Sequence, residues 1–202
     1  MQIIELVLDE DNLEENNGIT AISIVQSGAI EEDFIALKNQ EFKFAEQDKE
    51  KRILMGAALV PNKPIYRKSG EEEYYIFFSK DTVRKASELF FIKGNQSEST
   101  LEHESALKGL TVVESWIVEG EQDKSRHYGL NAPIGTWMVS MKVNNDDVWN
   151  NYVSTGKVKG FSIEAYFSSK LEQRPKDKTL KEEAAAQEFI NTISKILKES
   201  NE

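Results

Sequence analysis

The chain contains no cysteine and only two histidines among its 202 residues. The absence of cysteine excludes disulfide bonds, thiolate catalysis and cysteine-based zinc sites. With so few histidines a histidine-rich metal site is a poor expectation as well, and we expect neither a metal nor a cofactor. No apolar run approaches the roughly 18 residues that a membrane-spanning helix needs. These absences are typical of a protein that is made and used in a reducing cytoplasm.

Positive charge is also scarce, with 25 Lys and Arg against 35 Asp and Glu and a formal net charge of −10. Such a balance disfavours nucleic acid and anionic membranes as partners. The first residues, MQIIELVLDEDNLEENN, are acidic and lack the basic region and long apolar stretch of a secretory signal. What is present is a 39% hydrophobic and 30% charged composition, which predicts a soluble domain with a sizeable core.

Apolar periodicity predicts an α+β domain. We expect strands over 3–9, 19–25, 52–60, 73–78, 100–105, 110–120, 136–143 and 159–167. We expect helices over 80–91, with Ser79 as N-cap, over 144–156 and over 180–200, and a short helix or turn over 29–39. Residues 61–73 and 121–135 are predicted loops. The predicted division is a domain over 1–170 with acidic first strands, followed by a linker and an amphipathic helix over 171–202.

The candidate site begins in the last core strand, GFSIEAYF. Side chains alternate across a strand, so Phe161 and Ile163 face a core while Ser162 and Glu164 face the other way. A nucleophilic serine needs a base within hydrogen-bond reach, and the chain offers His103 in LEHES and His127 in KSRHYGL. Spacing alone does not separate this interpretation from that of an inert surface serine. The GxSxG, Walker A and HEXXH motifs are absent, so other hydrolase and nucleotide-binding classes have no motif support.

Several segments together resemble the XkdF-type phage serine proteases, a branch of the prohead (capsid maturation) protease group. The resemblance covers roughly residues 19–167, and the matching segments follow one another in the same order as in the family. It is carried by AISIVQSGAIEEDFIAL, ILMGAALVPNKPIYRKSGEEEYYIFFSKDTVRKASELFF, LEHES, TVVESWIVEG, GTWMVSMKVNNDDVW and GKVKGFSIEAYF. It implies a mainly antiparallel, barrel-like sheet with a few helices, as in herpesvirus and prohead proteases. It also implies that Ser162 is the nucleophile and His103 the general base, with His127 a weaker candidate.

The third catalytic group stays open. This protease group orients its histidine with an acidic residue or a second histidine. Glu164 is the first choice because it shares a strand face with Ser162, roughly 7 Å away along the backbone. Glu114 in VVESW is the second choice, and Glu172 and Asp177 follow. A carboxylate that only binds solvent or substrate is an equally good interpretation of Glu164.

The resemblance further implies a head maturation endopeptidase that cleaves scaffold and major capsid proteins. It would act inside the assembling procapsid in the cytoplasm of a bacterial host, and self-association is left open. A second interpretation belongs to another class: a catalytically inactive relative that serves as a structural or scaffold-associated head protein. A third, a generic binding module, requires the ordered series of segments to be a coincidence.

Overall fold

The computed structural model describes residues 2–8, 18–26, 35–37, 51–69 and 71–169. The chain divides into two units, Met1–Ser169 and Lys170–Glu202, and all described residues belong to the first. The predicted linker and carboxyl-terminal helix lie outside the described residues, so that part of the domain division stays a prediction. No helix of the described part is long and apolar enough to cross a membrane.

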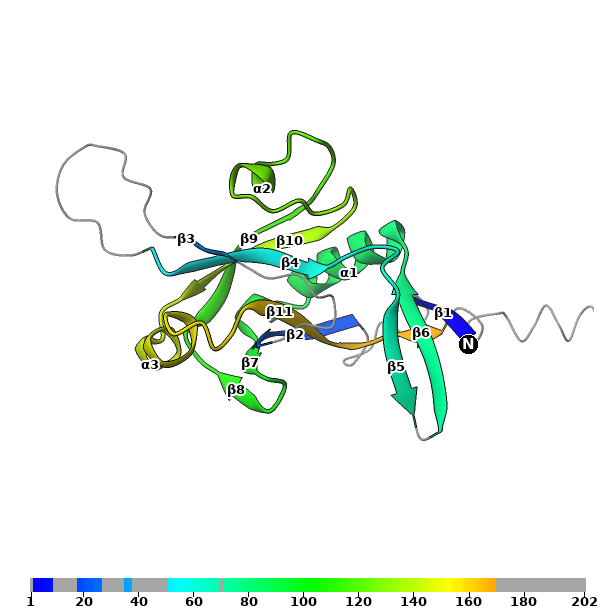
Figure 1. Cartoon of the computed structure of the whole chain (residues 1–202), viewed down its shortest axis with the longest axis horizontal. Helices are drawn as coiled ribbons and strands as arrows, with labels where there is room; N and C mark the ends of the chain where they lie inside the picture. Colours follow the sequence, from blue (N-terminus) through cyan, green and yellow to red (C-terminus); the bar gives the residue numbers. More distant parts are fainter. Residues whose placement is uncertain (1, 9–17, 27–34, 38–50, 70, 170–202) are drawn as a thin grey trace, which may run out of the picture. The chain divides into compact units, whose positions relative to one another are not determined.

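The described strands form three four-stranded sheets (Figure 1). In spatial order the first contains β12 (Ser168–Ser169), β1 (Gln2–Val7), β6 (Glu72–Phe78) and β5 (Ile65–Ser69). The second contains β3 (Ile35–Leu37), β4 (Ile53–Leu59), β10 (Trp137–Val143) and β9 (Leu110–Ile117). The third contains β11 (Gly160–Tyr166), β2 (Gly18–Val25), β7 (Ser99–Leu101) and β8 (Ser105–Leu107). The helical segments are α1 (Lys80–Ile92), η1 (Asn95–Ser97), α2 (Lys124–His127), α3 (Asp146–Val148) and η2 (Trp149–Val153).

This architecture confirms the predicted α+β class, in which sheet dominates and helices are few. Every pairing among the described strands is antiparallel except those of β1 with β6 and of β2 with β7. The strands of the described part stay in separate sheets and do not close into a barrel. The barrel and the likeness to herpesvirus proteases therefore remain predictions.

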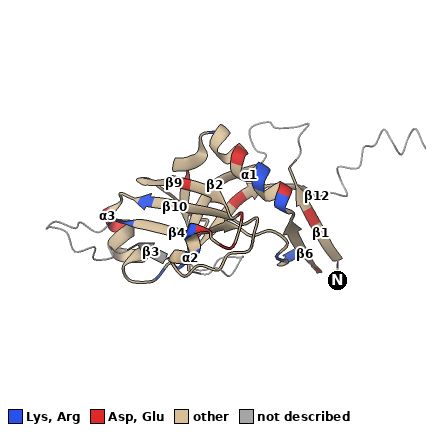
Figure 2. Ribbon diagram, turned by 90° about the horizontal axis from the view of Figure 1, so that it is seen from above, with Lys and Arg blue, Asp and Glu red and all other residues tan. Residues whose placement is uncertain are grey.

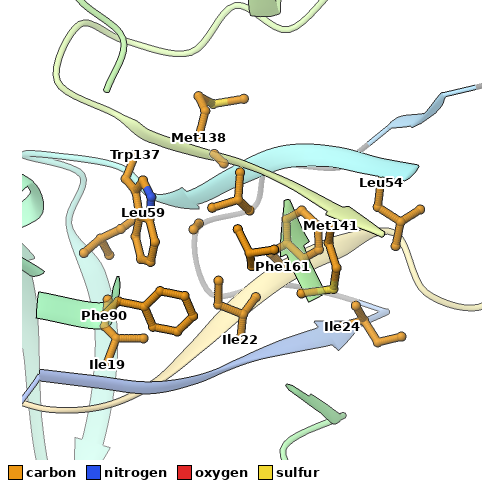
Figure 3. Packing of buried hydrophobic residues seen from close by; sticks show 14 of the residues in the cluster. Ile19, Ile22, Ile24, Leu54, Leu59, Phe90, Trp137, Met138, Met141 and Phe161 are labelled. Carbon is orange, nitrogen blue, oxygen red and sulfur yellow. The ribbon is translucent and has the colours of Figure 1, made fainter. Parts of the chain in front are cut away.

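The core lies between the second and third sheets. Figure 3 shows Met141 pointing toward Ile22 and Phe161, and Trp137 pointing toward Phe90, and all five side chains are almost fully buried. Trp137 also satisfies its polar atom, because its Nε1 donates a 2.8 Å hydrogen bond to the Ser115 hydroxyl. Burial of one such large apolar side chain contributes about 1.5–3 kcal/mol, so this shared core fixes the strands that carry the candidate site.

Helix α1 packs on this core as predicted. Ser79 caps it, since its hydroxyl accepts the Thr82 backbone N–H at 3.3 Å. The apolar face buries Val83 and Phe90 completely. The outer face carries charges of both signs (Figure 2), including the ion pair of Lys85 with Asp81 at 3.0 Å.

Two segments that were predicted to contain no strand each form one. Within the predicted loop 61–73, residues Ile65–Ser69 form β5 in an antiparallel hairpin with β6. Within the predicted short helix or turn 29–39, residues Ile35–Leu37 form β3, which pairs with β4. Both are edge strands, and an edge strand has one neighbour and needs little of the apolar alternation that identifies a central strand.

Candidate active site

Ser162 lies in the middle of β11, and the core behind the strand holds it in place. Its neighbour Phe161 is fully buried, whereas Ser162 itself is half-buried. In the antiparallel pairing of β11 with β2, Ser162 stands opposite Ser23, and Phe161 stands opposite Ile24. Residues directly opposite each other in a ladder project to the same face. Ser162 and Ser23 therefore share the face of the sheet that points away from the core, as the alternation predicted for Ser162.

His103 does not lie in a strand, contrary to the predicted strand over 100–105. It lies in the tight turn between β7 and β8, where Leu101 pairs with Ser105. Glu102 and His103 both adopt positive φ angles, 51° and 62°. This left-handed conformation is sparsely populated by residues other than glycine. The turn is therefore held by contacts with the rest of the fold rather than by its own preference.

Those contacts come from β2 and the residue that follows it. The backbone N–H of His103 donates to the Ser23 hydroxyl at 3.1 Å, and the N–H of Glu102 donates to the Ile24 carbonyl at 3.1 Å. The Glu102 carboxylate accepts the Gln26 backbone N–H at 2.7 Å. The bond to the Glu102 carboxylate is charge-assisted, and such bonds are among the stronger hydrogen bonds in proteins. Together the three bonds fix the backbone of His103 beside β2, the strand that pairs with β11.

Glu164 contacts the His103 side chain. Its Oε1 lies 3.4 Å from His103 Nδ1, and the same oxygen accepts a short hydrogen bond from the Thr100 hydroxyl. The side chains are 31% exposed for Glu164 and 41% exposed for His103. A contact between two partly exposed side chains adds little stability. Its consequence is orientation, because a carboxylate at Nδ1 leaves Nε2 as the nitrogen available to a nucleophile.

Ser162 and His103 are brought to one neighbourhood but are not bonded. Both adjoin Ser23: Ser162 across the ladder, and His103 through its backbone N–H. Among the described residues, no hydrogen bond joins the Ser162 hydroxyl to the imidazole. In unliganded enzymes such bonds are often long and tighten only when substrate is bound. The catalytic roles of Ser162, His103 and Glu164 stay predictions.

The other acid candidate, Glu114, lies elsewhere. It belongs to β9 of the second sheet, where its Oε2 accepts the Ser140 hydroxyl at 2.6 Å and lies 3.1 Å from Lys124 Nζ. The hydrogen bond from Ser140 and the Lys124 charge hold the pKa of Glu114 below its usual range, against the effect of partial burial. Its carboxylate thus belongs to a separate cluster.

The remaining candidates are placed as follows. His127 is exposed at the end of α2. Glu172 and Asp177 lie outside the described residues. Of the glycines near the serine strand, Gly156 has a φ of 70°, whereas Gly160 begins β11 in the extended conformation. No group of three or more potential metal ligands occurs in the part of the chain that the structure describes.

Sequence reasoning missed Ser23 and Thr100. The Ser23 side chain is fully buried, and its hydroxyl donates to the Thr100 carbonyl at 3.3 Å while it accepts from His103. Thr100 in turn donates to Glu164. One signal was available, because Ser23 interrupts the apolar segment ITAISIV and a buried polar side chain normally has a partner. The partners themselves required the strand order.

Comparison with protein families gives a match. A family model described as "Putative phage serine protease XkdF" matches residues 41–171. No curated protein and no solved structure matches the chain. The matched range contains Ser162, His103 and Glu164, and it covers more than half of the sequence. The chain therefore belongs to the family of phage serine proteases that this model describes.

Proposed function

We propose that the chain is a serine endopeptidase of phage head maturation, with Ser162 as nucleophile, His103 as general base and Glu164 as the residue that orients the imidazole. One observation carries the proposal. Glu164 contacts His103 Nδ1, and Ser162 projects from the same face of the same strand as Glu164. Family membership supports the reaction class, and the contact supports this choice of acid over Glu114.

The mechanism follows from these positions. The Ser162 hydroxyl attacks the scissile carbonyl while Nε2 of His103 takes its proton. His103, now charged and stabilised by Glu164, gives that proton to the leaving amine, and the carbon–nitrogen bond breaks. Water then attacks the acyl-enzyme, with His103 again as base, and releases the second product. Glu164 stays ionised throughout and holds the ring in the required tautomer.

The proposed substrates are scaffold and major capsid proteins inside the assembling procapsid, in the cytoplasm of a bacterial host. The phage origin in the family description and the acidic charge of the chain, which disfavours nucleic acid, support this setting. The chain should be co-expressed with its cognate capsid and scaffold proteins, and new termini mapped by mass spectrometry. Wild type should generate defined termini, and Ser162→Ala should generate none.

A second candidate is an inactive, structural head protein, which is favoured by the absence of a hydrogen bond between Ser162 and His103 in the described part of the chain. Covalent labelling by a fluorophosphonate separates the two. The active enzyme should be labelled at Ser162, and Ser162→Ala and His103→Ala should lose the label. Ser154→Ala is the matched control, because Ser154 is exposed and its hydroxyl bonds only to the Asn150 carbonyl in the described structure. If wild type is not labelled, the structural role is the better interpretation.

A further inference from the structure

A cavity of about 240 Å³ adjoins Ser162. Most of its wall is apolar and comes from several elements, with Leu59 of β4, Phe78 of β6 and Phe167 after β11 among the lining residues. Only two of the lining residues are polar, namely Ser162 and Arg67 of β5. An apolar cavity of about 150 Å³ already binds benzene. This cavity therefore has room for a side chain of the size of leucine, methionine or phenylalanine.

The cavity lies against the core-side face of β11 and reaches the edge of the strand at Ser162. Its lining includes Ile163, Ala165 and Phe167, which alternate along the chain and share one face, and their neighbour Ser162, whose side chain belongs to the other face. Contact with residues of both faces places this end of the cavity at the edge of the strand. Among the described strands β11 pairs only with β2, so its second edge has no strand partner. An edge of this kind binds an extended peptide by the addition of a strand, with pockets that select alternate side chains.

We propose that this cavity is the specificity pocket of the enzyme and takes a large apolar side chain from the substrate segment next to the scissile bond. This inference rests on the proposed function, because it assigns a substrate class to the same serine. A substrate strand along the edge of β11 would present its backbone to Ser162. The side chain that points inward would enter the space between Leu59, Phe78 and Phe167 and lose its contact with water, which favours binding.

Arg67 adds a second preference. Its Nη1 donates to the neighbouring Tyr66 carbonyl at 3.0 Å, and in the described structure no carboxylate lies within ion-pair distance of it. An exposed guanidinium at an otherwise apolar pocket is suited to a carboxylate on the substrate. The preferred cleavage segment would combine a large apolar residue with a nearby acidic residue. Arg67 would also offset the repulsion between the chain, with its net charge of −10, and an acidic peptide.

The first test is the cleavage profile of the wild-type protein on a library of denatured proteome peptides, with new termini identified by mass spectrometry. We expect Leu, Met or Phe to be enriched at one position beside the cut, with Asp or Glu enriched within a few residues. Arg67→Met should remove the acidic preference and keep the apolar one. Lys68→Met is the matched control, because Lys68 is on the same strand but pairs with Glu73 at 3.4 Å.

The second test fills the cavity. Ala58 lines it and is 1% exposed, so Ala58→Leu would place a branched alkyl group in the space reserved for substrate. Misfit of even one methylene in an apolar pocket costs about 10- to 200-fold in kcat/KM. We expect at least a tenfold loss for substrates with Leu or Phe at the selected position, and little loss for substrates with Ala there. If this variant does not fold, the wild-type profile alone decides.

Fluorophosphonate labelling separates the possible failures. If the wild-type protein takes no label, the proposed function is wrong, and the pocket assignment that rests on it is wrong as well. Wild type that is labelled at Ser162 but cuts without apolar enrichment overturns the pocket alone. The pocket assignment is also wrong if Ala58→Leu folds, keeps its label and still cleaves Leu and Phe substrates at the wild-type rate.

Discussion

Ser23 offers the sharpest test of how the site is held. Its side chain is fully buried, donates one hydrogen bond to the Thr100 carbonyl and accepts one from the His103 backbone N–H. Ser23→Ala removes the hydroxyl that accepts the His103 N–H and one hydrogen bond to the Thr100 carbonyl. An unsatisfied buried group costs about 1–3 kcal/mol. Because the His103 turn is partly exposed, water can reach its N–H, and we expect a loss of about 1–2 kcal/mol in the free energy of unfolding.

The matched control is Ser99→Ala in the neighbouring strand. Ser99 is also a buried serine, 3% exposed, but its hydroxyl has no hydrogen-bond partner among the described residues. Its removal should change the free energy of unfolding little or should raise it. Urea unfolding followed by tryptophan fluorescence measures both variants. At a slope of about 2 kcal/mol per molar urea, Ser23→Ala should lower the midpoint by about 0.5–1 M.

The same variant should reduce activity more than stability alone explains. At urea concentrations where Ser23→Ala is fully folded, the His103 turn has lost its bond to β2, so we expect slower cleavage and slower fluorophosphonate labelling. Equal midpoints for Ser23→Ala and Ser99→Ala would refute the energetic reasoning. Normal cleavage by folded Ser23→Ala would refute the idea that this hydroxyl positions the histidine.

Three further outcomes are expected. Glu164→Gln should slow cleavage at least about 100-fold because the imidazole loses its orienting carboxylate, while its urea midpoint stays within error; if Glu114→Gln slows cleavage instead, the acid has been assigned wrongly. The free energy of unfolding should decline as pH falls through the depressed pKa of Glu114, because the Ser140 bond favours the ionised carboxylate and its contribution is lost when Glu114 is protonated. The free energy of unfolding of Glu114→Gln should change less with pH over the same acidic range. Asp123→Ala should cost about 0.5–2 kcal/mol by thermal unfolding, because it removes the cap of α2 and the 3.1 Å bond from Trp116 Nε1.

Local patterns predicted a good part of the fold. The alternation in GFSIEAYF placed Phe161 toward the core and Ser162 with Glu164 on the opposite face, because a strand buried on one face imposes a period of two. Helix α1 and its Ser79 cap followed from an apolar face and a local hydrogen bond. In each case the deciding interactions lie within one element, so the sequence of that element contains them.

The wrong predictions concern segments whose conformation depends on interactions with distant parts of the chain. Strand β5 carries Arg67 and Lys68 and buries only Ile65 among the side chains described for it, so it has the composition of a surface loop. Its strand conformation comes from pairing with β6. The turn at His103 has a backbone conformation that its own residues disfavour, and partners on β2 hold it there. Neither effect can be predicted without knowing which distant segment is adjacent.

Strand β2 has a place in the site that a comparison of matched residues alone does not reveal. The family model begins at residue 41, whereas β2 covers Gly18–Val25. β2 nevertheless lies between the two strands concerned, antiparallel to β11 with Ser162 and parallel to β7, which leads to His103. The serine and the histidine have no direct strand pairing of their own, and Ser23 adjoins both. The relative position of Ser162 and His103 is therefore set by a segment outside the matched range. If these residues are the nucleophile and the base, substitutions in β2 should act on catalysis through geometry rather than through chemistry.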